Sequence, residues 1–173
     1  MYATGSKVVH PCYGAGIIDR IKRSSIGSSD SKYYVIAIDG ATGGLEVMVP
    51  VEQAADFGLR RVMGRSRIYK LIAGCTELPA DDEVVSDYKK RKLIMTEWLK
   101  SGDFGQVVVA VRMLHCLSLR RPLGMTDKRF YDDGMDMLAT EYALAVDVDV
   151  DDAKQQIREK LDQMAPEEDA ETA

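Results

Sequence analysis

The spacing of apolar residues changes character near Pro50. Upstream of it, short runs rich in Val, Ile and Tyr alternate with turn residues, a pattern that predicts β-strands. The predicted strands are residues 6–11, 15–23, 32–39 and 45–50. Segments rich in serine and glycine separate the second, third and fourth of them, as in hairpins. Four short strands within the first fifty residues favour a small barrel.

Downstream of Pro50 the apolar residues recur at helical spacing. Two short helices are predicted, one at 51–58 ended by Gly58 and one at 66–74 capped by Ser66 and ended by Gly74. Longer helices are predicted at 81–102, 103–121, 126–146 and 149–164, with Asp103, Thr126 and Asp149 as N-caps. The expected fold class is therefore α+β, with a small β-barrel followed by an all-helical bundle.

These patterns divide the chain into three parts. We expect a barrel with its short helical bridge at 1–78, a helical domain at 79–165 and an acidic flexible tail at 166–173. Of the 173 residues, 46% are hydrophobic and 29% charged, as is usual for a soluble globular protein. No run approaches the ~20 apolar residues of a membrane helix, and the first ten residues lack the apolar core of a signal peptide.

Charge is distributed unevenly along the chain. The net charge is −5, yet residues 89–129 carry 10 basic and 3 acidic side chains, and residues 130–173 carry 3 basic and 14 acidic ones. A local basic block can steer an anionic partner even in an acidic protein. The alternative is a solvated helix face that is paired in part with the acidic segment.

The stretch Val8–Ile21, which reads VVHPCYGAGIIDRI, could be a phosphate loop, a metal site or a corner of the sheet. A phosphate loop needs a helix after its glycines, but here the next residues alternate like a strand. A zinc site needs a second pair of ligands at suitable spacing, which the sequence does not offer. A corner is therefore predicted, where Pro11 ends strand pairing and Gly14 and Gly16 supply backbone freedom.

Little in the sequence indicates an enzyme, a metal or a cofactor. Of the two histidines, His115 lies in an apolar helical run, and the neighbouring Cys116 would point away from it. The acidic clusters at 80–87 and 147–152 are typical of helix N-termini, and the second lacks the glycine of a calcium-binding loop. The three cysteines are far apart and odd in number, so we expect reduced thiols in a cytoplasmic protein.

An ordered set of motifs resembles the CarD/CdnL family of bacterial transcription regulators. The motifs are GSKVVHPCYGAGIIDRI, YYVIAI and VMVPVE in the first half, and SGD, RPLGMTDKRF and ATEYALA in the second. The resemblance covers roughly residues 5–160 in the family's order. It implies a Tudor-like barrel, of the SH3 type, that binds the β subunit of RNA polymerase. It also implies a helical domain that contacts promoter DNA at the upstream edge of the transcription bubble and stabilises the open complex.

The resemblance points to Ser24 and Met48 for polymerase binding, and the nearby Arg23 and Ile26 are predicted to join them. Family members often have one arginine after the second strand and another in the motif VRVP, where this chain has Ser24 and Met48. Three interpretations stay open. The interface is more apolar, with Met48 as an adaptable contact; the polymerase surface has changed as well; or the chain binds polymerase weakly or not at all.

The segment YKKRK begins the first long helix and places an aromatic side chain beside four cations. The residues assigned to DNA binding are Tyr88, Lys89, Lys90, Arg91, Lys92, Arg112, Lys128 and Arg129, and Arg120 and Arg121 could extend the same patch. Family members typically have a wedge tryptophan where this chain has Tyr88. Trp98 lies ten residues on, about 280° around the helix, so it is assigned to packing.

The sequence thus predicts a monomeric, non-enzymatic regulator that docks on the polymerase β subunit and contacts promoter DNA, with no membrane partner. The linked barrel would hold the helical domain at high effective concentration over the promoter. The alternative is an adaptor that binds polymerase or another protein without productive DNA contact, as the Ser24, Met48 and Tyr88 departures allow. A small hydrolase is a third class, with little in the sequence to favour it.

Overall fold

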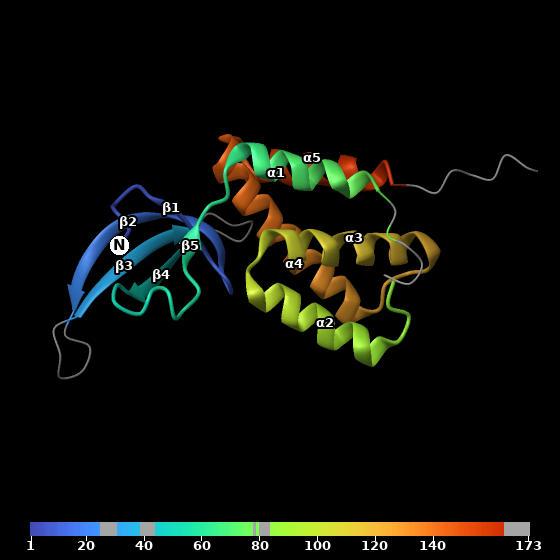
Figure 1. Cartoon of the computed structure of the whole chain (residues 1–173), viewed down its shortest axis with the longest axis horizontal. Helices are drawn as coiled ribbons and strands as arrows, with labels where there is room; N and C mark the ends of the chain where they lie inside the picture. The colour runs from blue at the N-terminus through green and yellow to red at the C-terminus, as the bar shows by residue number, and fades with distance from the viewer. Residues whose placement is uncertain (25–30, 39–43, 78, 80–83, 165–173) are drawn as a thin grey trace, which may run out of the picture.

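A β-sheet and a helical bundle lie side by side in the computed structural model of the chain (Figure 1). The structure describes residues 1–24, 31–38, 44–77, 79 and 84–164. Ile26, the predicted acidic tail and the first residues of the predicted helix at 81–102 lie outside the described residues. None of the described helices is both long and apolar enough to cross a membrane.

The sheet has five strands in the order β4-β3-β2-β1-β5, and every neighbouring pair is antiparallel. The strands are β1 (Lys7–His10), β2 (Gly14–Ser24), β3 (Ser31–Ile38), β4 (Leu45–Pro50) and β5 (Arg60–Arg61). The four predicted strands are confirmed, and β5 is an addition that pairs with Val8 and Val9. Closure into a barrel is not seen in the described part of the chain, because the two edge strands β4 and β5 do not pair with each other.

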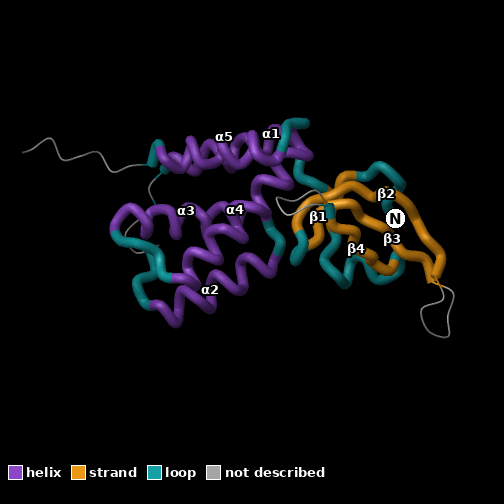
Figure 2. Tube along the Cα trace, turned by 180° about the vertical axis from the view of Figure 1, so that it is seen from behind, coloured by secondary structure: helices purple, strands orange, loops and turns teal. Residues whose placement is uncertain are grey.

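Helices form the second half of the chain (Figure 2). They are α1 (Arg65–Ala73), the 3-10 turn η1 (Gly74–Thr76), α2 (Tyr88–Ser101), α3 (Phe104–Arg120), α4 (Met125–Val146) and α5 (Val150–Asp162). Asp103 caps α3 as predicted, since its side chain accepts a hydrogen bond from the Gln106 amide at 2.9 Å. Gly102 ends α2 with a φ of 64°, a conformation that glycine adopts without strain.

One predicted helix is absent, and two predicted caps and one predicted helix start are wrong. Residues 51–58 form successive turns instead of a helix, and they end at Gly58, whose φ is 72°. The N-caps of α1 and α4 are Gly64 and Gly124 instead of Ser66 and Thr126, which lie inside the helices. The described part of the 81–102 prediction becomes helical only at Tyr88, because the Asp87 side chain accepts the Lys90 amide at 2.8 Å and starts the helix there.

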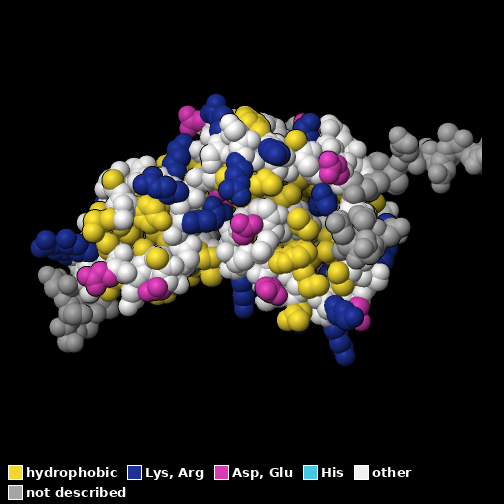
Figure 3. All heavy atoms as spheres, in the orientation of Figure 1, with side chains coloured by type: hydrophobic (Ala, Val, Ile, Leu, Met, Phe, Trp, Pro, Cys, Tyr) yellow, Lys and Arg dark blue, Asp and Glu magenta, His cyan; other side chains and the backbone are white. Residues whose placement is uncertain are grey.

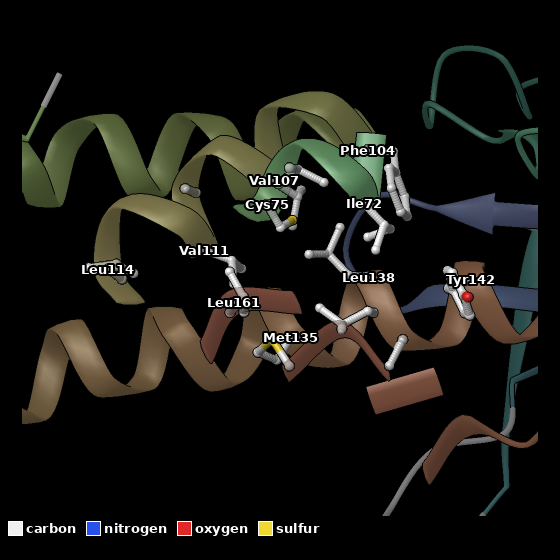
Figure 4. Close-up of a cluster of buried hydrophobic side chains, with 14 of the residues drawn as sticks. Ile72, Cys75, Phe104, Val107, Val111, Leu114, Met135, Leu138, Tyr142 and Leu161 are labelled. Atoms are coloured by element: carbon white, nitrogen blue, oxygen red, sulfur yellow. The ribbon is translucent and has the colours of Figure 1, made fainter. Parts of the chain in front are cut away.

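Each half of the chain has its own hydrophobic core. The sheet buries Val8, Ile18, Tyr34 and Ile36 with their neighbours. The larger helical core draws on every described helix, and Figure 4 shows side chains of α1, α3, α4 and α5 meeting in it. Helix α1 and η1 contribute buried side chains to this helical core, so the predicted helical bridge packs with the bundle.

The predicted corner after β1 is where the sheet meets the bundle. Pro11 follows the last residue of β1, as expected, and lies against both Gly58 and Gly102. A Cβ on Gly102 would approach the Pro11 Cα to 2.9 Å, so only glycine fits there. Gly14 has a φ of 89° and faces Thr140 of α4. This glycine-lined contact brings the corner close to α2 and α4.

Candidate functional site

Tyr88 is the first residue of α2 and lies on the surface, 48% exposed. Its phenol O–H donates a hydrogen bond to Oγ1 of Thr126, at 3.2 Å, in the first turn of α4. The Arg91 guanidinium carbon lies 5.8 Å from the centre of the ring, within cation–π range. An aromatic side chain is therefore held at the point where α2 and α4 begin, with part of the ring open to a partner.

Arg91 is buried, although the sequence analysis assigned it to DNA binding. It is 1% exposed, and its guanidinium makes a two-point ion pair with Asp127, with Nη2 2.7 Å from Oδ2. Nη1 donates to the carbonyl oxygens of Val85 and Ser86, at 2.8 and 3.0 Å. Contrary to the predicted DNA contact, Arg91 offers no surface to a phosphate, because four of its five N–H groups make internal hydrogen bonds and its side chain is buried.

The remaining cations of this region are exposed. Lys89, Lys90 and Lys92 lie on the first turns of α2, and Figure 3 shows basic side chains projecting over the beginning of that helix. Lys128 and Arg129 lie on the first turns of α4 and pair with Asp132 at 3.1 Å and Asp133 at 3.7 Å. Such exposed pairs are worth only ~0–1 kcal/mol, so an anionic partner can displace the carboxylates. We call Tyr88 with these five cations the basic corner.

Arg112, Trp98, Arg120 and Arg121 lie outside the basic corner. Arg112 is half-buried on α3, and its Nη1 donates to the Gly74 carbonyl oxygen in η1 at 3.3 Å, so its guanidinium is directed toward η1. Trp98 is half-buried and packs against the helical core, which confirms its assignment to packing. Arg120 and Arg121 are exposed at the end of α3, before α4 begins. The predicted DNA-binding set is thus only partly brought together.

Met48 lies on β4, an edge strand of the sheet, and is 40% exposed. It stands opposite Val35, and this register places it on the outer face of the sheet, away from the core residues Val47 and Val49. On the same outer face, Arg20 makes a two-point pair with Glu46, at 3.0 and 3.2 Å. An edge strand with unpaired backbone groups is a template for a further strand.

The other predicted polymerase contacts divide between the two faces of the sheet. Ser24 is half-buried opposite Ser31 and shares the outer face with Met48. Arg23 is exposed opposite Lys32, and strand alternation points it to the other face. Two of the predicted polymerase contacts, Arg23 and Met48, therefore point to opposite faces of the sheet.

An open groove with an apolar lining runs along β4, and we call it the β4 groove. Its larger side chains are Tyr13, Leu45, Met48 and Phe57, of which Tyr13 is 53% exposed and Phe57 49% exposed. Sequence reasoning missed both aromatic residues. Phe57 lies in the segment that was wrongly predicted as a helix. Tyr13 lies in the corner after β1, for which only a role in turning the chain was predicted. Both are aromatic residues in turn segments, and that feature of the sequence could have indicated them as candidate contacts.

Both histidines are buried and have structural partners. Burial lowers the pKa of His115 and of His10, and the nearby Asp162 carboxylate only partly offsets the effect on His115. Cys75 is buried, and this burial raises the pKa of its thiol to about 11, which is unsuited to a nucleophile at neutral pH. Within the described ranges, no three His, Cys, Asp or Glu side chains gather in a way that could hold a metal ion.

Comparisons with known proteins found a matching family model for each half of the chain. The model of the CarD-like/TRCF RID domain matches residues 2–63, and that of the CarD C-terminal domain matches residues 79–158. A protein of Bacillus subtilis (strain 168) named "Putative transcription factor YdeB" is 26% identical over 141 residues, which are 82% of this chain and 90% of that protein.

A Tudor-like antiparallel sheet joined to a helical domain of this kind defines a two-part transcription regulator. The chain belongs to the CarD-like family. The resemblance inferred from the motifs is thereby confirmed, and the expected fold class with it. The family is one of transcription factors.

Proposed function

We propose that this protein docks on the β subunit of RNA polymerase through β4 and stabilises the promoter open complex through the basic corner. The observation that carries the proposal is the placement of Tyr88 among the exposed cations of α2 and α4. Cations attract phosphates without reading sequence, and an aromatic ring can stack or wedge at a distorted base step.

The electrostatics of the basic corner support a duplex partner. Three lysines occupy the first turns of α2, where the helix dipole adds to their positive field and the capping Asp87 carboxylate offsets only part of it. Two more cations come from α4, close by, because the Tyr88–Thr126 hydrogen bond joins the two helix beginnings. A bound phosphate backbone would replace Asp132 and Asp133 as the partner of Lys128 and Arg129.

The shape and chemistry of the β4 groove support docking. Main-chain hydrogen bonds to an added strand would supply affinity, and the side chains of Tyr13, Met48 and Phe57 would supply specificity. Met48 is a flexible thioether where the family often has an arginine, which favours a more apolar contact on the polymerase. Docking there would leave the basic corner, at the far beginning of α2, free for DNA.

The adaptor remains the second candidate, and two observations favour it. Arg91, one of the predicted DNA-binding residues, is paired with Asp127 inside the protein. Lys128 and Arg129 already pair with acidic side chains on their own helix. Leu93 and Met125 are 70% and 91% exposed near the same helix beginnings, and apolar side chains of that kind suit a protein partner. DNA binding therefore has to be measured directly.

The test is the salt dependence of binding to promoter duplex. If the basic corner meets phosphates, log K falls with log[salt] by about 0.9 for each phosphate neutralised. The double variant Lys89→Glu/Lys90→Glu should weaken binding and reduce that slope by about 2, uniformly across sequences.

The matched control is Arg67→Glu/Lys70→Glu, which reverses two exposed cations on α1. It should leave the slope unchanged, since α1 lies on another side of the bundle from α2 (Figure 1). An affinity for duplex DNA that does not change with salt concentration would favour the adaptor. An equal loss of affinity in both double variants would favour it as well.

A further inference from the structure

The ring of Tyr88 is held by two adjacent residues of α4. Thr126 accepts the hydrogen bond from the phenol O–H, and Asp127 fixes Arg91, whose guanidinium lies under the ring. Asp127 is 4% exposed and Arg91 1% exposed, so the support beneath the ring is rigid and shielded from water. Thr126 precedes Asp127 in the same first turn of α4.

We infer that Thr126, together with the buried Arg91–Asp127 pair, positions the Tyr88 ring in one orientation toward DNA. The inference rests on the proposed function. It adds that Thr126 acts through Tyr88, and that Arg91 serves the DNA contact from inside the protein instead of binding a phosphate. These are positioning residues, and Tyr88 is the side chain that meets the nucleic acid.

The physical benefit is pre-organisation. An aromatic side chain on the first turn of a helix would otherwise sample several rotamers, and DNA binding would have to restrict it. The hydrogen bond to Thr126 and the contact with Arg91 impose that restriction beforehand. The contact needs a hydroxyl at the far end of the ring, so this surface is fitted to tyrosine.

The experiment measures open-complex lifetimes with the full chain, polymerase and a promoter. Tyr88→Phe removes the donor, Thr126→Val removes the acceptor with little change of shape, and the two are combined in a third variant. Each single variant should shorten the lifetime roughly three-fold, as loss of one hydrogen bond would. The double variant should be no worse than either single variant, because both remove the same bond. Thr126→Ser keeps a hydroxyl and should restore the lifetime.

A second measurement needs no DNA. In the free protein, nuclear Overhauser contacts between the Tyr88 ring and residue 126 should be present, and should weaken in Tyr88→Phe and in Thr126→Val. Thermal midpoints close to that of the unchanged chain would show that these variants still fold.

The outcomes separate the inference from the proposed function. If Tyr88→Ala shortens the lifetime but Thr126→Val does not, the inference is overturned and the function stands. Additive effects in the double variant would also overturn the inference, since the phenol O–H would then have a partner of its own on the DNA. If Tyr88→Ala has no effect on the lifetime, the proposed function fails and the inference with it.

Discussion

Arg60 and Glu141 join the sheet to the helical bundle through a two-point ion pair. Nη1 and Nη2 of Arg60, on β5, lie 2.7 Å from Oε1 and Oε2 of Glu141, on α4. Glu141 is 2% exposed, and its Oε1 also accepts the backbone amide of Met63 at 2.9 Å. Arg60 donates further to the Gly102 carbonyl oxygen, at 2.6 and 3.1 Å. The pair thus links the sheet, which carries the proposed docking surface, to the bundle, which carries the proposed DNA surface.

Removal of Arg60 should destabilise the whole fold. In Arg60→Met the Glu141 carboxylate would stay buried without its cation, and loss of one partner of a buried pair costs about 3–5 kcal/mol in the free energy of unfolding. Urea unfolding monitored by circular dichroism would measure this. Arg67→Met, at an exposed position of α1, is the control and should change the free energy by less than about 0.5 kcal/mol. Equal stability of the two variants would show that the junction does not depend on the pair.

Stability should fall as the pH drops below the ordinary histidine pKa of 6.5. Burial lowers the pKa of His10 and His115 in the folded protein, so the unfolded chain binds more protons between the two values. The stabilisation is complete above the unfolded pKa and is lost as the pH falls through the folded pKa. Unfolding free energies at several pH values should show this slope, and His10→Gln/His115→Gln should flatten it. A double variant with an unchanged slope would assign the dependence to other groups.

Docking should be sensitive to charge at Met48. In Met48→Asp a carboxylate would be buried without a partner against the polymerase β subunit, and affinity should fall roughly ten-fold or more. Surface plasmon resonance with a β-subunit fragment measures it. Leu119→Asp makes a similar change at a similarly exposed position on α3 and should leave the affinity intact. Normal binding by the Met48→Asp variant would indicate that the protein docks on the β subunit through a surface other than β4.

Trp98 should matter for stability alone. It is half-buried against the helical core, so Trp98→Ala should cost about 2 kcal/mol in the free energy of unfolding, less than the 3–5 kcal/mol of a fully buried aromatic residue. Affinity for duplex DNA, measured below the unfolding transition, should not change. A loss of DNA affinity in a folded Trp98→Ala variant would indicate that Trp98, not Tyr88, meets the DNA.

The hydrophobic pattern was enough to predict four strands and the long helices, because period-two and helical spacing are local properties. It could not reveal β5, since two arginines carry no strand pattern and the partner of Arg60, Glu141, lies 81 residues away. The predicted helix at 51–58 failed for a related reason. Local propensity favoured a helix there, but the chain has to turn so that Ala54 and Leu59 enter the sheet core.

The site was predictable in composition but not in detail. The run YKKRK correctly indicated where the cations gather, yet nothing in it distinguishes Arg91 from its lysine neighbours. That distinction comes from Asp127 on another helix, and only the fold brings the two together. Arg23 was predicted as a contact because it is next to Ser24 in the sequence, and the β-strand register places it on the face opposite Met48. Thr126, expected to cap a helix, proved to contact Tyr88.

The central claim is that Tyr88 stabilises the open complex from the basic corner. The most direct test is the lifetime of polymerase–promoter open complexes formed with Tyr88→Ala, after confirming that this variant still binds the β subunit. Base stacking is worth ~1–3 kcal/mol, so the account predicts a lifetime shortened roughly ten-fold with thermal stability nearly unchanged. An unchanged lifetime in a folded variant that still docks would contradict it.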